Sequence, residues 1–143
     1  MGNQPLKSMP IQTGIAIFAL VGMVDAFYTA LQQRYPSLFQ FCFSSSFKRV
    51  SCRKILHGPY ARLFTIPNAW IGVGVYLFLA IIYGFGANNY LSILGAVISA
   101  LALIVSLYLL YVQARILKAY CIFCLISTLI LITITFLALT HVR

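Results

Sequence analysis

Long runs of apolar residues dominate the chain, and few polar positions interrupt them. A helix needs about 20 mostly apolar residues to cross the hydrocarbon core of a bilayer. Four segments meet that length, at residues 11–31, 66–85, 91–112 and 119–140. None shows the two-residue alternation of a membrane β-strand. The pattern therefore predicts an all-α fold, a transmembrane four-helix bundle that forms one domain over residues 1–143.

The connections between these segments differ sharply in length. The stretch "GFGANNY" predicts a tight turn, so the second and third helices are expected to be antiparallel neighbours. The connection "QARILK" is also short. Residues 32–65 form a long loop with two cysteines between the first two helices, and long loops are commonly functional. Pro67 follows this loop and suits the first turn of the second helix.

The first apolar segment is expected to be a retained helix. It is longer than the apolar core of a signal peptide, and no small-residue cleavage site follows it. The composition agrees with a membrane protein, because 62% of the residues are hydrophobic and 8% are charged. A soluble domain carries roughly 25% charged residues.

The basic residues predict an orientation. The formal net charge is +9, but the bases lie in the connections, where they mark orientation and lipid contact. We therefore expect no nucleic-acid partner. The loop-side bases are Arg34, Lys48, Arg49, Arg53, Lys54, Arg62, Arg115 and Lys118, and the terminal-side bases are Lys7 and Arg143. The positive-inside rule then places the long loop in the cytoplasm.

All four cysteines fall on the long-loop side. Cys42 and Cys52 belong to the loop, and Cys121 and Cys124 begin the fourth helix. Residues three apart share a helix face, so the second pair can meet. Unpaired N–H groups at a helix start lower a thiol pKa, which favours a thiolate at Cys121, nearer the water. Cys124 lies one turn deeper, where it can meet a hydrophobic oxidant from the lipid.

Several cysteine chemistries compete. Haem attachment needs a histidine after the second cysteine, and position 125 is Leu. Structural zinc is disfavoured by the wide spacing of the loop pair and by the apolar surroundings of the helix pair, so we expect no metal. Static disulfides and ordinary packing of buried cysteines remain alternatives. Redox exchange fits best, from a protein dithiol through the loop pair and the helix pair to a lipid-soluble oxidant.

The order of motifs resembles that of the vitamin K epoxide reductase family. The resemblance rests on Cys42, on "SCRKIL" with Cys52, on "PYARLFTIPNAWIG" and on "YCIFC", and it covers about residues 14–139. It implies a four-helix membrane core and a quinone, of ubiquinone or menaquinone type, as the electron acceptor. Another family of quinone-linked disulfide generators places its C-x-x-C in the first connection, so it fits less well.

The resemblance also implies roles for single residues. Cys124 would react with the quinone, Cys121 would accept the connection from Cys52, and Cys42 would exchange with a thioredoxin-like partner. Asn68 would hydrogen-bond a quinone carbonyl. The pocket walls would be Leu56, Tyr60, Trp70 and Ile71. No thioredoxin-like domain follows the fourth helix, so we expect the electron donor to be a separate thioredoxin-fold protein.

The chain departs from the family pattern at two places. Gly58, preceded by His57, stands where the family has Ser or Thr, so the hydroxyl role is unfilled or passes to His57. His57 is thus a candidate quinone contact or proton donor, or simply a polar contact. Thr128 takes the place of a family Tyr in the quinone pocket, which favours quinone reduction over epoxide reduction.

Asp25 is the only acidic residue and lies inside the first helix. An acid within the membrane is a functional candidate by default, and near the cysteines it could relay a proton. The alternative is that it only fixes helix packing. A small transporter would need more polar residues at mid-membrane, and Asp25 alone offers that.

These observations predict a membrane thiol oxidase that makes protein disulfides and reduces the quinone pool. The alternatives are a disulfide-stapled membrane scaffold without turnover and a vitamin K epoxide reductase proper. Resting pairings Cys42–Cys52, Cys52–Cys121 and Cys121–Cys124 all fit one turnover cycle. Relatives mostly face an oxidising compartment, whereas the charges place this loop in the cytoplasm. We therefore predict an inverted member, as suits a hyperthermophile with intracellular disulfides.

Overall fold

The computed structural model describes residues 8–35, 62–63, 66–117 and 121–143. The long helices are α1 (Ser8–Arg34), α3 (Asn68–Gly84), α4 (Asn89–Val112) and α5 (Ile122–Val142). A π-helical turn, η2 (Gln113–Leu117), continues α4, and strands β1 (Arg62–Leu63) and β2 (Ile66–Pro67) pair antiparallel. The predicted all-α membrane bundle of four helices is confirmed.

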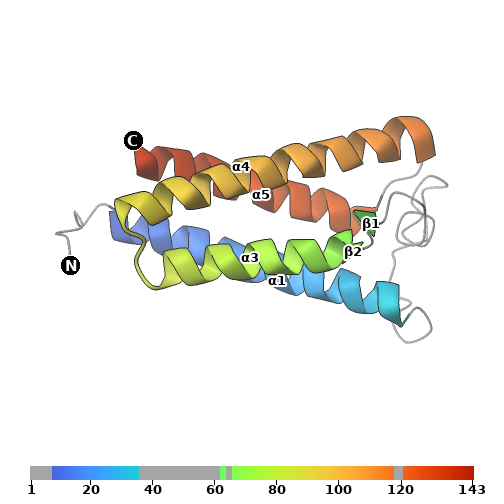
Figure 1. Ribbon diagram of the computed structural model, residues 1–143, viewed down its shortest axis with the longest axis horizontal. Coiled ribbons are helices and arrows are strands. Elements are labelled where there is room, and N and C mark those ends of the chain that lie inside the picture. Colours follow the sequence, from blue (N-terminus) through green and yellow to red (C-terminus); the bar gives the residue numbers. More distant parts are fainter. Residues whose placement is uncertain (1–7, 36–61, 64–65, 118–120) are drawn as a thin grey trace.

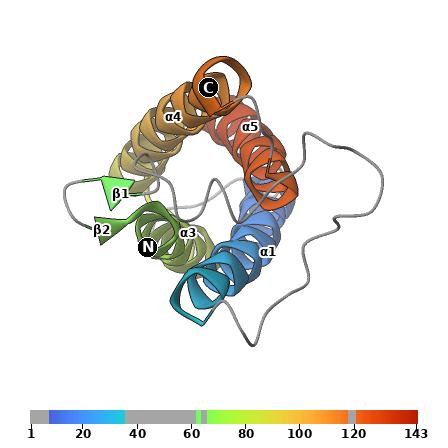
Figure 2. The same cartoon turned by 90° about the vertical axis from the view of Figure 1, so that its right-hand side faces the viewer.

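The four helices are arranged in a ring. Seen along the bundle, α1, α3, α4 and α5 follow one another around it (Figure 2). The start of α1 and the end of α5 lie at one end, and the start of α5 lies at the other (Figure 1). Helix α1 packs closely on α3 and α5, and α4 packs on α5, whereas α3 and α4 touch only lightly. The ring is therefore most loosely closed between α3 and α4.

The helices are built to face lipid. Within the described residues, three of them are long and apolar enough to cross a membrane, Pro10–Arg34, Asn89–Ile116 and Ile122–Val142. Helix α3 has 17 residues and is therefore about 26 Å long, slightly less than the hydrocarbon core. Many large apolar side chains on the outside of the bundle are exposed, as they would be to lipid. The chain is an integral membrane protein.

Two boundaries differ from the prediction for physical reasons. Pro67 does not lie in the first helical turn, so that prediction is wrong. It is extended (φ −58°, ψ 131°) and pairs with Arg62, so α3 begins at Asn68. Similarly, α5 begins at Ile122 rather than at residue 119, because Cys121 is extended (φ −105°, ψ 121°). The predicted tight turn between α3 and α4 is present, with Gly86 at φ +85°.

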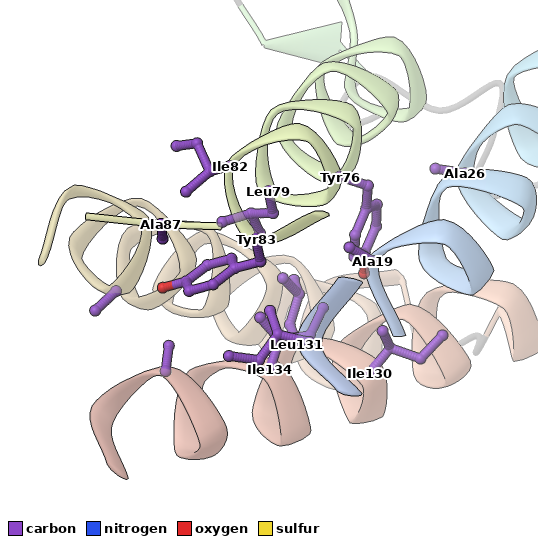
Figure 3. Packing of buried hydrophobic residues seen from close by; sticks show 13 residues of the cluster. Ala19, Ala26, Tyr76, Leu79, Ile82, Tyr83, Ala87, Ile130, Leu131 and Ile134 are labelled. Carbon is purple, nitrogen blue, oxygen red and sulfur yellow. The ribbon is translucent and has the colours of Figure 1, made fainter. Parts of the chain in front are cut away.

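The interior combines small residues with two buried tyrosines (Figure 3). Apolar burial does not drive helices together in lipid, so close packing must do so. Gly22 leaves room for Tyr76, since a Cβ at Gly22 would overlap the tyrosine ring. Gly95 does the same for Tyr83, whose Oη would lie 2.7 Å from an added Cβ. The two glycines thus let the rings sit between helices and fix the positions of α3 against α1 and α4.

A polar cluster joins the helices at the end of the bundle opposite the cysteines. Gln12 Nε2 donates to the carbonyl of Ala87 at 3.3 Å and lies 3.0 Å from His141 Nε2. The rings of His141 and Tyr83 meet edge to face, with centroids 6.3 Å apart. These contacts connect α1, α5 and the α3–α4 turn, so they hold the far end of the bundle together.

Candidate functional site

The start of α5 carries the C-x-x-C pair. Cys121 directly precedes the helix and has no exposed surface, whereas Cys124 in the first turn is partly exposed. The two sulfur atoms are hydrogen-bonded to each other and are not joined in a disulfide. Cys121 thus precedes the span that begins at Ile122, as expected, but it is buried rather than exposed. The reason is that its extended backbone brings it next to η2, where Gln113 Oε1 accepts the backbone N–H of Cys121 at 3.3 Å.

The surroundings of Cys121 favour its thiolate. Cys121 lies just outside the membrane span that begins at Ile122. The hydrogen bond from the Cys124 thiol lowers the pKa of Cys121 below that of an ordinary thiol, and the backbone N–H groups of Cys124 and Phe123 act in the same direction. Burial opposes the shift without reversing it. The N–H groups at the start of the helix thus lower the pKa of Cys121 as expected, but the neighbouring thiol of Cys124 lowers it more.

A cavity of about 360 Å³ lies inside the bundle and reaches Cys124. This volume falls in the range of small-molecule sites, which are mostly apolar with a few polar groups. All four helices and η2 contribute to the lining. The polar side chains among the lining residues are Asp25, Thr29, Gln33, Asn68, Tyr76, Ser106, Gln113 and Ser127. The cavity can therefore hold a flat apolar ring and present hydrogen-bonding groups to its edge.

The sequence was compared with known proteins. The model of the vitamin K epoxide reductase family matches residues 14–139, which is most of the chain. The chain belongs to this family. A search of curated proteins found no match. Membership in the vitamin K epoxide reductase family makes the protein a membrane oxidoreductase whose chemistry is related to disulfides. The family is associated with quinone and vitamin K substrates.

In this member of the vitamin K epoxide reductase family, three of the predicted site residues lie together around the cavity. Asn68 is the first residue of α3, Ile71 lies one turn later, and Asp25 faces them from α1. All three line the cavity that reaches Cys124. The structure therefore brings the intramembrane acid, the predicted quinone ligand and the inner cysteine to one space.

Two other predicted pocket residues lie outside the cavity lining. Trp70 is 40% exposed on the outside of the bundle, and its ring meets that of Phe27 edge to face, with centroids 6.1 Å apart. Thr128 is buried, and its Oγ1 donates to the carbonyl of Cys124 at 2.8 Å and lies 2.6 Å from Ser106 Oγ. Thr128 thus connects the cysteine turn to α4 rather than facing the cavity.

The remaining predicted site residues fall in the loop before α3. They are Cys42, Cys52, Leu56, His57 and Tyr60, and all lie outside the described residues, as does Gly58. Their predicted roles stay predictions.

Six polar cavity residues were not singled out from the sequence, namely Thr29, Gln33, Tyr76, Ser106, Gln113 and Ser127. Tyr76 Oη donates to the carbonyl of Ser127 at 3.0 Å and lies 2.7 Å from Ser127 Oγ. Gln113 reaches the cavity from η2. Polar residues inside apolar segments are a usable signal for Tyr76 and Ser127. Gln113 gave no such signal, because its segment reads as a connection between helices.

Proposed function

We propose that this protein is a membrane thiol oxidase that transfers electrons from protein dithiols to a quinone. A separate thioredoxin-fold protein reduces the loop pair Cys42 and Cys52, which in turn reduces the helix pair Cys121 and Cys124. The acceptor is a ubiquinone or menaquinone. The observation that carries the proposal is the cavity of about 360 Å³, which places Cys124 beside an apolar space inside the membrane.

The residues of the cavity fit a quinone head group. Ile71, Val75 and Leu131 provide apolar walls, and Asn68 lies in the same lining with an amide N–H that can donate to a carbonyl. A bound quinone would supply the oxidising power, taking two electrons and two protons and leaving as the quinol. The chain supplies the two electrons from the thiols of Cys121 and Cys124, which end as a disulfide.

The loose contact between α3 and α4 supports access from the lipid. A shallow groove on this side of the bundle is lined by Ile71, Gly74, Val75, Phe78 and Ile98. Ile71, Val75 and Ile98 also line the cavity. The apolar tail of a quinone would lie along this groove while the head group occupies the cavity.

A direct assay tests the function. The purified protein in detergent, supplied with a permeant dithiol and a short-chain quinone, is expected to reduce the quinone well above the uncatalysed rate, as followed by absorbance. A disulfide-stapled scaffold would leave the quinone oxidised, and its disulfides would resist the mild reductant. A preference for vitamin K epoxide over quinone in the same assay would instead favour the epoxide reductase.

Asp25 is proposed to relay protons to the cavity. It lines the cavity on α1, as do Tyr76 on α3 and Ser127 on α5, which are hydrogen-bonded to each other. General acid–base groups typically contribute about 100-fold or more to rate. Asp25→Asn, which is nearly the same size, is therefore expected to slow quinone reduction by about that factor at unchanged thermal stability. An unchanged rate would leave Asp25 with a packing role only.

The proposed orientation places the cysteine end in the cytoplasm. Arg34 ends α1 and Arg115 lies in η2, both at this end of the bundle, while Arg143 lies at the other. A membrane-impermeant thiol reagent, applied to intact cells with the loop pair reduced, is expected to label Cys42 and Cys52 only after the cells are opened. Strong labelling of intact cells would refute this orientation and place the cysteines outside.

A further inference from the structure

One buried side chain lies beside the cysteines of the helix pair. Gln113 begins the π-helical turn η2 and is 3% exposed. Its Oε1 accepts the backbone N–H of Cys121 at 3.3 Å. The same side chain lines the cavity beside Cys124. A single amide thus bonds the backbone of Cys121 and lies in the cavity beside Cys124.

The chemistry of the amide explains why this residue is suited to the position. Glutamine carries an acceptor oxygen and an N–H₂ donor on one planar group. The oxygen accepts from Cys121, and the N–H₂ group is the donor that the same side chain can offer to Cys124 in the cavity. A glutamate in the same place would offer acceptors only, and a leucine would offer neither.

The π-helical turn gives Gln113 this placement. The backbone N–H of Gln113 bonds to the carbonyls of both Leu110 and Leu109, at the point where α4 passes into the wider turn. Such turns occur mostly as short insertions in α-helices, frequently at functional sites. Gln113 lines the cavity beside Cys124, so this local change of helix geometry occurs where α4 meets the cysteine pair.

We propose that Gln113 is a catalytic residue of thiol–disulfide exchange at the helix pair, where its Oε1 fixes Cys121 and its N–H stabilises the sulfur of Cys124. This inference rests on the proposed function, in which these two cysteines form the redox pair. An incoming thiolate attacks Cys121 Sγ of the Cys121–Cys124 disulfide. A new S–S bond forms to Cys121, and the electron pair of the broken bond leaves on Cys124 as a thiolate. The N–H of Gln113 meets this developing charge.

The test isolates this step from both the loop and the quinone. In a Cys42→Ser, Cys52→Ser background, the oxidised, quinone-free protein is mixed with a small permeant dithiol. Alkylation of the released thiols at timed intervals gives the rate constant for reduction of the Cys121–Cys124 disulfide. Losing a hydrogen bond to a charged group should slow the step about tenfold or more in Gln113→Leu and Gln113→Glu. Ser99→Ala should keep the parent rate, because the hydroxyl of Ser99 bonds within its own helix, to the carbonyl of Ala96 at 3.0 Å.

The two substitutions answer different questions. Gln113→Glu keeps an acceptor for the N–H of Cys121 and is close to Gln in size, so it is informative even if Gln113→Leu fails to fold. Slow reduction by Gln113→Glu at parent thermal stability supports the donor role, and a parent rate overturns it. Because no quinone is present, the result is separate from the proposed function. If the helix pair is reduced at the normal rate but the protein never reduces quinone, only the proposed function is contradicted.

Discussion

Replacing Cys124 with alanine is expected to abolish quinone reduction. Cys124 is the cysteine that lines the cavity, and Cys121 is buried next to it beneath Gln113. Without Cys124, the helix pair cannot form its disulfide, so no two-electron donor remains beside the bound quinone. Loss of a reacting side chain commonly costs several orders of magnitude, so a decrease of at least about 100-fold is expected in Cys124→Ala. The measurement is quinone reduction by the purified variant with a permeant dithiol.

A control separates lost chemistry from lost folding. Thr133 lies on the same helix, and its hydroxyl bonds the carbonyl of Leu129 within that helix at 3.0 Å. Thr133→Ala should therefore reduce quinone at the parent rate. Undiminished quinone reduction by Cys124→Ala would remove Cys124 from the electron path and with it the proposed mechanism.

Replacing Cys42 with serine should separate the two electron donors. If the loop pair shuttles electrons, a thioredoxin-like protein can deliver them only through that pair, whereas a small dithiol reaches the helix pair directly. Transfer from a reduced thioredoxin-like donor is expected to fall by at least about 100-fold in Cys42→Ser, since no mixed disulfide can form at that position. Reduction with the permeant dithiol should stay within about twofold of the parent, because the helix pair is untouched.

The comparison is made in one protein preparation, with the same quinone and with both donors. The ratio of the two rates is the informative quantity, since a general loss of folded protein lowers both equally. Equal loss with the protein donor and with the small dithiol would argue against a shuttling loop. It would instead place Cys42 in a structural disulfide that both reactions need.

The fold was predictable because bilayer thickness fixes the length of each apolar segment. Helices α1, α4 and α5 follow directly from that requirement. The strand pair β1–β2 was not predictable, because each strand has two residues and no periodic pattern. This pairing takes up Ile66 and Pro67, which is why α3 starts later than the apolar run suggests.

The cavity was predictable in part. Asn68, Ile71 and Val75 line it, and their spacing places them on one face of α3. Trp70 follows Asn68 by two positions, which is about 200° around a helix, so it points away from that face. The resemblance to the family suggested Trp70 from its motif without regard to this rotation. The same resemblance suggested Asn68 and Ile71, which do line the cavity.

The contacts of Gln113 could not be read from the sequence. They depend on the π-helical geometry of η2 and on a hydrogen bond to a residue eight positions later. The burial of Cys121 has the same origin, since the extended backbone before α5 is held by that bond. Sequence patterns report the length and face of a helix, whereas these features arise from how two helix ends meet.

Electron transfer from the helix pair to quinone can be measured directly, with neither a partner protein nor a dithiol. The Cys42→Ser, Cys52→Ser protein is fully reduced, freed of reductant and mixed anaerobically with one equivalent of quinone. Quinol is measured by absorbance, and the Cys121–Cys124 disulfide by mass spectrometry of the digested protein. Quinol and this disulfide are expected to form in equal amounts. Quinone that stays oxidised while both cysteines remain thiols would contradict the proposed function.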